Sequence, residues 1–210
     1  MNLTDLITPG LSANLGSRVQ GDARNAFLSW LSQTTRLLQI ETALPSTAFV
    51  VERFQGHEGV SQLFEFQVDC LSSSSQFELK TLIGEEVTLK LLLADGSHRR
   101  WHGYVTQAAA LGSDGGLARY RLTLQPWLAF LEQRRDSYLF QDLNLQDLLT
   151  ELFTDYPEAH YRFDLTHTLP ARSLWVQYNE TDLSFIQRLL AEQGLSWRFE
   201  HDQTNPDDSP

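Results

Sequence analysis

Apolar and polar residues alternate with a period of two through much of the stretch between residues 36 and 130, which predicts β-strands with one buried and one wet face. The apolar positions of four such runs are Phe64, Phe66, Val68 and Cys70; Val87, Leu89, Leu91 and Leu93; Trp101, Gly103 and Val105; and Ala118, Tyr120, Leu122 and Leu124. Asp95-Gly96 separates the second run from the third and predicts a hairpin, because glycine accepts a positive φ without steric cost. Several short antiparallel strands divided by turns are typical of a barrel or sandwich.

The period changes after Pro126, where residues three and four apart begin to share apolar character. LNLQDLLTELF predicts a helix capped by Asn144, and NETDLSFIQRLLAEQG predicts a second helix, capped by Asn179 and stopped by Gly194. PWLAFLEQRRD is typical of a helical turn, HYRFDL of a short strand and SLWVQY of a longer one. LSWRFEH alternates again and predicts a strand with Trp197 and Phe199 on one face.

These patterns divide the chain into four parts. Residues 1–35 form an N-terminal extension, partly ordered or containing a short helix with Phe27 and Trp30 on one face. We expect a β-barrel domain over residues 36–130 and a small α/β subdomain over residues 131–201. Residues 202–210 are a polar tail or a linker. The predicted fold class is therefore β-rich α+β, an antiparallel barrel followed by a small α/β subdomain.

Composition excludes several classes of protein. The chain has 210 residues and a formal net charge of −11, and such an acidic balance argues against nucleic acid as a partner. No apolar run is long enough for a membrane-spanning helix, and the N-terminus lacks the basic start and apolar core of a Sec signal peptide. The single cysteine, Cys70, excludes an intramolecular disulfide and is typical of folding in a reducing compartment.

Candidate catalytic and metal-binding residues are weak. His57-Glu58 lacks the second histidine that a zinc-binding helix needs, and His98 and His102 would stand about 13 Å apart on one strand. Cys70 falls on an inward face, where a reactive thiolate is disfavoured. The carboxylates considered for glycoside chemistry are Asp69, Glu85, Glu86 and Asp95. Alternating strand carboxylates usually form a solvated face, so we expect no catalytic residue, no metal and no cofactor, and a role in binding or assembly.

A set of ordered segments goes further than composition. The chain contains, in order, VERFQGHEGVSQLFEFQVDCLS, LIGEEVTLKLLL, HGYVTQ, YRLTLQPWLAFLEQRRDSYLFQDLNLQDLL and VQYNETDLSFIQRLLAEQGLSWRFE. Together they resemble the N-terminal, phage-tail-hub-like region of the VgrG family, the spike proteins of type VI secretion systems. The most diagnostic block carries the motif residues Gln177, Tyr178, Glu180, Asp182, Phe185, Arg188 and Gly194. We expect their role to be structural, with Arg188 making a charge contact.

The resemblance implies an assembly protein rather than an enzyme. Family hubs are homotrimers of β-barrel domains that sit on the Hcp tube, contact baseplate components and carry effectors or adaptors into target cells. Such a protein is cytoplasmic when assembled and is then exported by the type VI machinery. The resemblance also implies that six aromatic residues belong to the core or to the junction of the subdomains: Trp101, Trp127, Phe140, Tyr178, Phe185 and Trp197.

Two departures from the family pattern stand out. The segments stop near Pro210, before a second barrel, neck and needle, so we interpret the chain as an N-terminal fragment of a longer protein. Residues 1–35 match no part of the common core. Two alternatives stay open: a phage or phage-derived contractile tail hub or baseplate component, and an unrelated enzyme such as a carboxylate-pair glycosidase.

Overall fold

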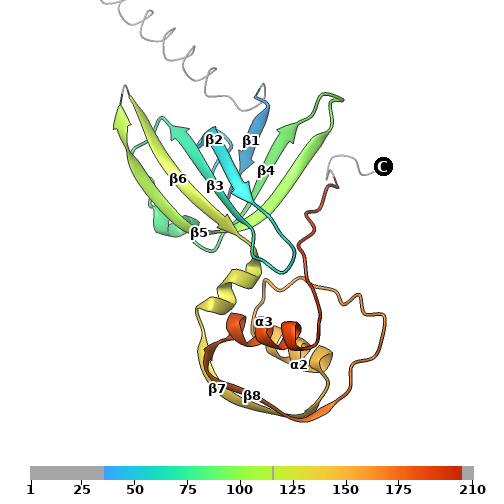
Figure 1. Cartoon of the computed structure of the whole chain (residues 1–210). Helices are drawn as coiled ribbons and strands as arrows, with labels where there is room; N and C mark the ends of the chain where they lie inside the picture. The colour runs from blue at the N-terminus through green and yellow to red at the C-terminus, as the bar shows by residue number, and fades with distance from the viewer. Residues whose placement is uncertain (1–35, 115, 205–210) are drawn as a thin grey trace, which may run out of the picture.

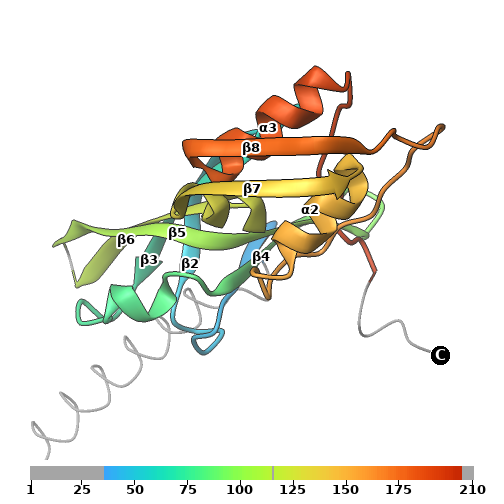
Figure 2. The same cartoon turned by 90° about the horizontal axis from the view of Figure 1, so that it is seen from below.

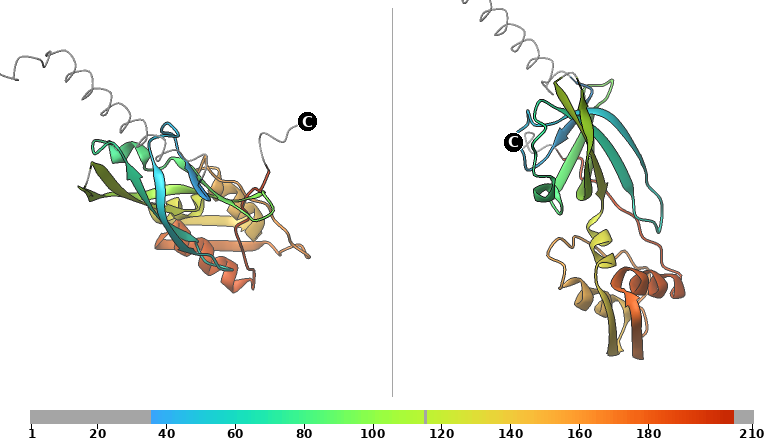
Figure 3. Two further views of the ribbon diagram at one scale, coloured as in Figure 1. Left: turned by 90° about the horizontal axis from the view of Figure 1, so that it is seen from above. Right: turned by 90° about the vertical axis from the view of Figure 1, so that its left-hand side faces the viewer.

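The structure, a computed structural model, describes residues 36–114 and 116–204. They form two units, a β unit and an α/β unit, that are stacked along the long axis of the molecule (Figure 1; Figure 3, right). The chain passes from the first unit to the second near Pro126 and runs back along the first after the last helix. The predicted helix in the N-terminal extension and the end of the polar tail lie outside the described residues.

The β unit is a single antiparallel sheet of six strands in the order β1-β4-β5-β6-β3-β2. The strands are β1 (Leu38–Glu41), β2 (Val50–His57), β3 (Glu65–Ser72), β4 (Glu86–Leu92), β5 (His98–Asp114) and β6 (Leu117–Gln125). The Asp95-Gly96 turn joins β4 to β5 as predicted, with Gly96 at a φ of 86°. A 3-10 turn, η1 (Leu79–Leu82), precedes β4.

The sheet curls into a half-barrel, so that its two edge strands, β1 and β2, come into contact (Figure 1). β5 is the longest strand, and register shifts after Val105 and Ala110 help it to bend. The concave face is filled by the alternating residues of β3 and β6: Phe66, Val68, Cys70, Tyr120, Leu122 and Leu124 are all buried. The predicted barrel-like fold class is therefore confirmed.

The α/β unit pairs two strands, β7 (Arg135–Leu143) and β8 (Arg172–Thr181), and covers them with two helices, α2 (Leu145–Phe153) and α3 (Asp182–Glu192). The helices lie on the side of this sheet that faces the β unit (Figures 1 and 2). A 3-10 helix, η2 (Trp127–Glu132), links the units. The side chain of Asn144 accepts from Asp147 N, so the predicted cap of α2 is confirmed.

Two predicted strands do not form. Residues 160–165 and 195–201 are extended, but neither segment belongs to a sheet of the described part of the chain. Residues 195–201 still alternate between half-buried and exposed positions, as do residues 162–165, because one side of each stretch packs on the protein. Phe199 packs against the cores of both units and thereby joins them.

Candidate functional site

The diagnostic block folds around one buried carboxylate. Asp182, the first residue of α3, is fully buried and accepts three hydrogen bonds, from Arg134 Nε at 2.6 Å, Tyr156 Oη at 2.6 Å and Gln177 Nε2 at 2.7 Å. Its own N–H donates to the carbonyl of Arg134. A buried charge is tolerated when it is paired and fully hydrogen-bonded. This carboxylate links three parts of the chain to the start of α3: the residue pair after η2, the turn after α2, and β8.

The contact with Asp182 also shifts the pKa values of its two ionisable partners, Tyr156 and Arg134. Desolvation and the neighbouring carboxylate of Asp182 both raise the pKa of the Tyr156 phenol. The carboxylates of Asp155 and Asp182 raise the pKa of the Arg134 guanidinium, against the opposing effect of its partial burial. Both groups therefore stay protonated and donate to Asp182 at neutral pH.

Arg188 forms a second, more exposed set of contacts on α3. Its guanidinium donates to Glu180 Oε1 at 2.5 Å, to Glu192 Oε1 at 3.2 Å and to the carbonyl of Val176 at 3.0 Å. These contacts join the end of β8 to the middle and end of α3. The charge contact predicted for Arg188 is thus present, and Glu180 is its main partner.

The other motif residues divide between core and surface. Phe185 is fully buried and stacks on Phe140 with ring centroids 5.8 Å apart, and Gly194 ends the helix at a φ of 67°. Tyr178 does not belong to the core, since 79% of it is exposed. It lies on the outer face of the β7–β8 sheet, away from the helices, because β8 alternates and Gln177 takes the inward position.

The predicted cap of α3 was wrong. Thr181 caps the helix, with its side-chain oxygen accepting from Ser184 N at 3.1 Å. Asn179 instead adopts a left-handed φ of 49° where the register of β7 and β8 shifts, so it is the extra residue of a bulge. Asparagine favours both caps and left-handed positions, and the sequence pattern did not separate the two.

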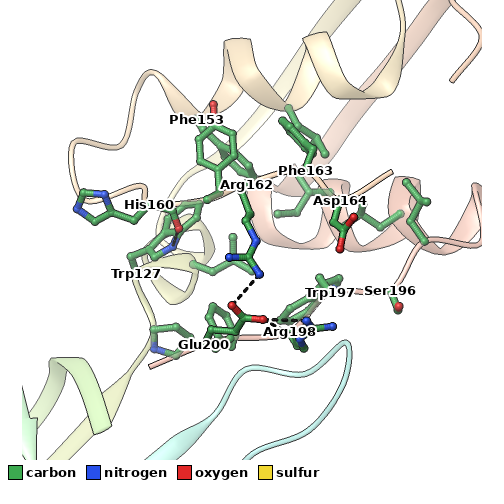
Figure 4. A pocket seen from close by; sticks show the side chains of 18 of the residues that line it. Trp127, Phe153, His160, Arg162, Phe163, Asp164, Ser196, Trp197, Arg198 and Glu200 are labelled. Carbon is green, nitrogen blue, oxygen red and sulfur yellow. Dashed lines mark hydrogen bonds and ion pairs between the residues drawn. The ribbon is translucent and has the colours of Figure 1, made fainter. Parts of the chain in front are cut away.

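A groove of about 1070 Å³ lies between the units. It is lined by η2, α2, α3 and the two extended segments, including Phe163 and Trp197. Figure 4 shows Arg162 and Glu200 pointing toward one another across it, 2.8 Å apart. The hydrogen bond from Arg198 and the charge of Arg162 lower the pKa of the Glu200 carboxyl, which makes it an ion-pair partner rather than a proton donor.

The residues considered for catalysis are held apart or neutralised. Glu86 begins β4 and Asp95 lies in the turn beyond its other end, so the strand, about 20 Å long at the usual rise, separates them. Asp69 is bound by Arg121, which lowers the pKa of its carboxyl. Burial raises the pKa of the Cys70 thiol far above neutrality. Within residues 36–114 and 116–204, no three metal-ligating side chains gather in one place.

Sequence reasoning missed Arg134 and Tyr156, the two partners that hold Asp182. Arg134 lies 48 residues before the carboxylate and Tyr156 lies 26 before it, so no local spacing connects them.

Among the described residues, no helix is both long and apolar enough to cross a bilayer.

Comparison with known proteins gives one consistent result. Residues 57–207 match the model of the phage tail baseplate hub (GPD) family. The type VI secretion system spike protein VgrG1c of Pseudomonas aeruginosa is 29% identical over 94% of the chain, and VgrG4b of the same organism is 35% identical over 72%. The chain spans only 27% and 19% of the length of these relatives.

The fold leads to the same family. A component of the type VI secretion system of E. coli, described as structurally similar to the phage T4 tail proteins gp27 and gp5, superposes with a TM-score of 0.70. It is 26% identical, and the superposition covers 78% of this chain and 45% of that one. Phe199 packs against the cores of both units, and the Asp182 contacts hold the α/β unit together. The chain therefore belongs to the phage tail baseplate hub family, as a hub region of the VgrG type.

Proposed function

We propose that this chain is the N-terminal hub part of a type VI secretion spike, a structural protein that takes its place in a trimeric hub on the Hcp tube. The observation that carries the proposal is the family match over residues 57–207, which spans β3 to β6 of the β unit and then the α/β unit. Its named relatives are type VI spike proteins, so the phage tail hub is the less favoured alternative.

The construction of the two units supports a mechanical role. Each unit has its own buried core, and a paired, fully bonded carboxylate fixes the strand-to-helix turn at Asp182. Of the groups considered for chemistry, Asp69 is paired with Arg121 and Cys70 is buried. A part that passes force needs such rigid packing. We propose that it assembles in the cytoplasm, contacts baseplate components and effectors or adaptors, and leaves through the secretion machinery.

The test is the absolute mass of the purified chain by light scattering, alone and with Hcp. We expect a trimer, or a complex with Hcp, at concentrations up to about 100 µM. A phage tail-tube protein is the matched control. A folded monomer that leaves the mass of Hcp unchanged contradicts the proposal that this part carries tube-contacting surface, and binding to the phage protein alone favours the phage alternative.

A further inference from the structure

One stretch of β5 extends beyond its neighbour. β6 ends at Gln125, which pairs with Tyr104, and Pro126 then carries the chain away. β5 continues back to His98, still paired with β4 on its other side. Residues 98–103 of β5 therefore pair with β4 on one side but have no β6 residue opposite them on the other. Their main-chain groups on that side form a short sheet edge. Such edges accept another strand by main-chain hydrogen bonding.

The chain's own residues 201–203 occupy this edge with side chains. Gln203 Oε1 accepts from Arg100 N at 2.8 Å, and Gln203 Nε2 donates to the carbonyl of Arg100 at 2.9 Å. His201 Nδ1 accepts from His102 N at 3.1 Å. A carboxamide presents an N–H donor and a carbonyl acceptor side by side, as an extended residue's main chain does, so Gln203 takes the place of one residue of an antiparallel strand. Figure 1 shows this segment rising beside the β unit.

The charge of the edge indicates what it would accept. The strand reads His98, Arg99, Arg100, Trp101, His102, which is basic in a chain whose net charge is −11. Two copies paired through this edge would bring arginines opposite arginines, which is unfavourable. The segment that lies there in this structure contains Asp202, whose main-chain carbonyl lies 2.9 Å from His102 Nε2. Hydrogen bonds from Thr204, together with the nearby charges of His102 and Arg100, lower the pKa of the Asp202 carboxyl. An acidic strand is the complementary partner.

We propose that the β5 edge at Arg100 and His102 is a docking site for an extended acidic polypeptide strand, and that residues 201–203 hold the site closed in its absence. This inference goes beyond the hub function and does not depend on trimer formation. A partner strand replaces the Gln203 and His201 contacts with two main-chain pairings and adds charge pairing to Arg99.

The first test measures binding of a synthetic peptide of about nine residues that alternates valine and glutamate, by fluorescence anisotropy, to the full chain. Gln203→Ala removes the two side-chain hydrogen bonds from Gln203 to Arg100 and leaves the His201 contact, so we expect it to bind the peptide about tenfold more tightly than the natural chain. Thr204→Ala is the matched control. Thr204 is one residue further along and bonds to Asp202, so this variant should bind as the natural chain does.

The second test separates strand pairing from charge attraction. Methylating the peptide nitrogens that face the β5 edge blocks its hydrogen bonds without changing charge, and should abolish binding. Methylating only the nitrogens on the opposite side should leave it unchanged. Equal binding of both methylated peptides, equal binding of a valine–lysine peptide, or no binding by Gln203→Ala overturns the proposal. Hydrogen exchange should also slow at the His102 amide when the peptide binds to Gln203→Ala, and an unchanged rate there counts against it.

Discussion

A single carboxylate organises the block of sequence by which the family is recognised. Asp182 is fully buried, yet it touches a guanidinium, a phenol and a carboxamide that come from three separate parts of the chain. Burying a charge costs free energy unless its hydrogen bonds are complete, and here three donors converge on two oxygens. The residue therefore serves to fix one geometry at the start of α3.

Replacing this carboxylate should be costly even when its size is kept. In Asp182→Asn, the charge that pairs with Arg134 is lost and an amide nitrogen faces other donors, so we expect the free energy of unfolding to fall by roughly 3 kcal/mol. Urea denaturation measures it. Asp155→Asn is the control, since Asp155 pairs with the same Arg134 at the surface and should cost less than about 1 kcal/mol. Equal losses in the two variants would contradict a special role for Asp182.

At the scale of elements, the end of β8 and the start of α3 form one continuous strand-to-helix connection that is fixed by local contacts. Asn179 forms a bulge, Thr181 caps the helix, and Arg188 reaches back from the helix to Glu180. The bulge turns the chain so that Asp182 points inward. Tyr178 lies three residues after the inward-facing Trp175 and next to inward Gln177, so it is left on the outer face.

The cap can be identified by substitution. Thr181→Ala should lower the free energy of unfolding by about 1 kcal/mol, because Ser184 N loses its acceptor. Asn179→Gly should change it by no more than a few tenths, since glycine adopts the left-handed φ freely. Both values come from urea titration. An unchanged free energy of unfolding in Thr181→Ala would show that another residue caps the helix.

Alternation predicted β3 and β6 well because burial of one face imposes a period of two, and Phe66 and Leu122 obey it. It also predicted a strand at residues 195–201, where the period is present but no neighbouring strand pairs with the backbone in the part of the chain described. A period of two in the sequence shows which side of an extended segment is buried. It does not show whether another strand hydrogen-bonds to the backbone along its edges. The Asp182 contacts were equally hidden, because Arg134 and Tyr156 are distant in sequence.

At the scale of the whole molecule, two cores are coupled through one returning segment. The chain leaves the β unit once, at Pro126, and comes back along it after Gly194. Phe199 packs against both cores and meets Phe64 edge-on, with ring centroids 5.2 Å apart. The units also meet through Tyr104, which packs edge-on against Phe130 of η2. Phe199 is the aromatic ring that packs against both cores, so we expect it to contribute strongly to whether the units unfold together.

Phe199→Ala should separate the stability of the two units. Loss of the ring removes packing from both cores, so we expect one unit to open alone and its amides to exchange faster than those of the other. Hydrogen exchange followed by mass spectrometry measures this. Arg198→Ala, a neighbouring exposed residue, is the control. If amides in both units respond equally to Phe199→Ala, the coupling runs through η2 instead.

The burial of Cys70 has a practical consequence for spectroscopy. It is the one cysteine of the sequence, its side chain is enclosed by the half-barrel, and its thiol stays protonated at neutral pH. Maleimide reagents attack thiolates, so the native chain behaves as if it were cysteine-free. A cysteine introduced at any exposed position then becomes a unique attachment point for a dye, a spin label or a cross-linker, and the natural residue can stay in place.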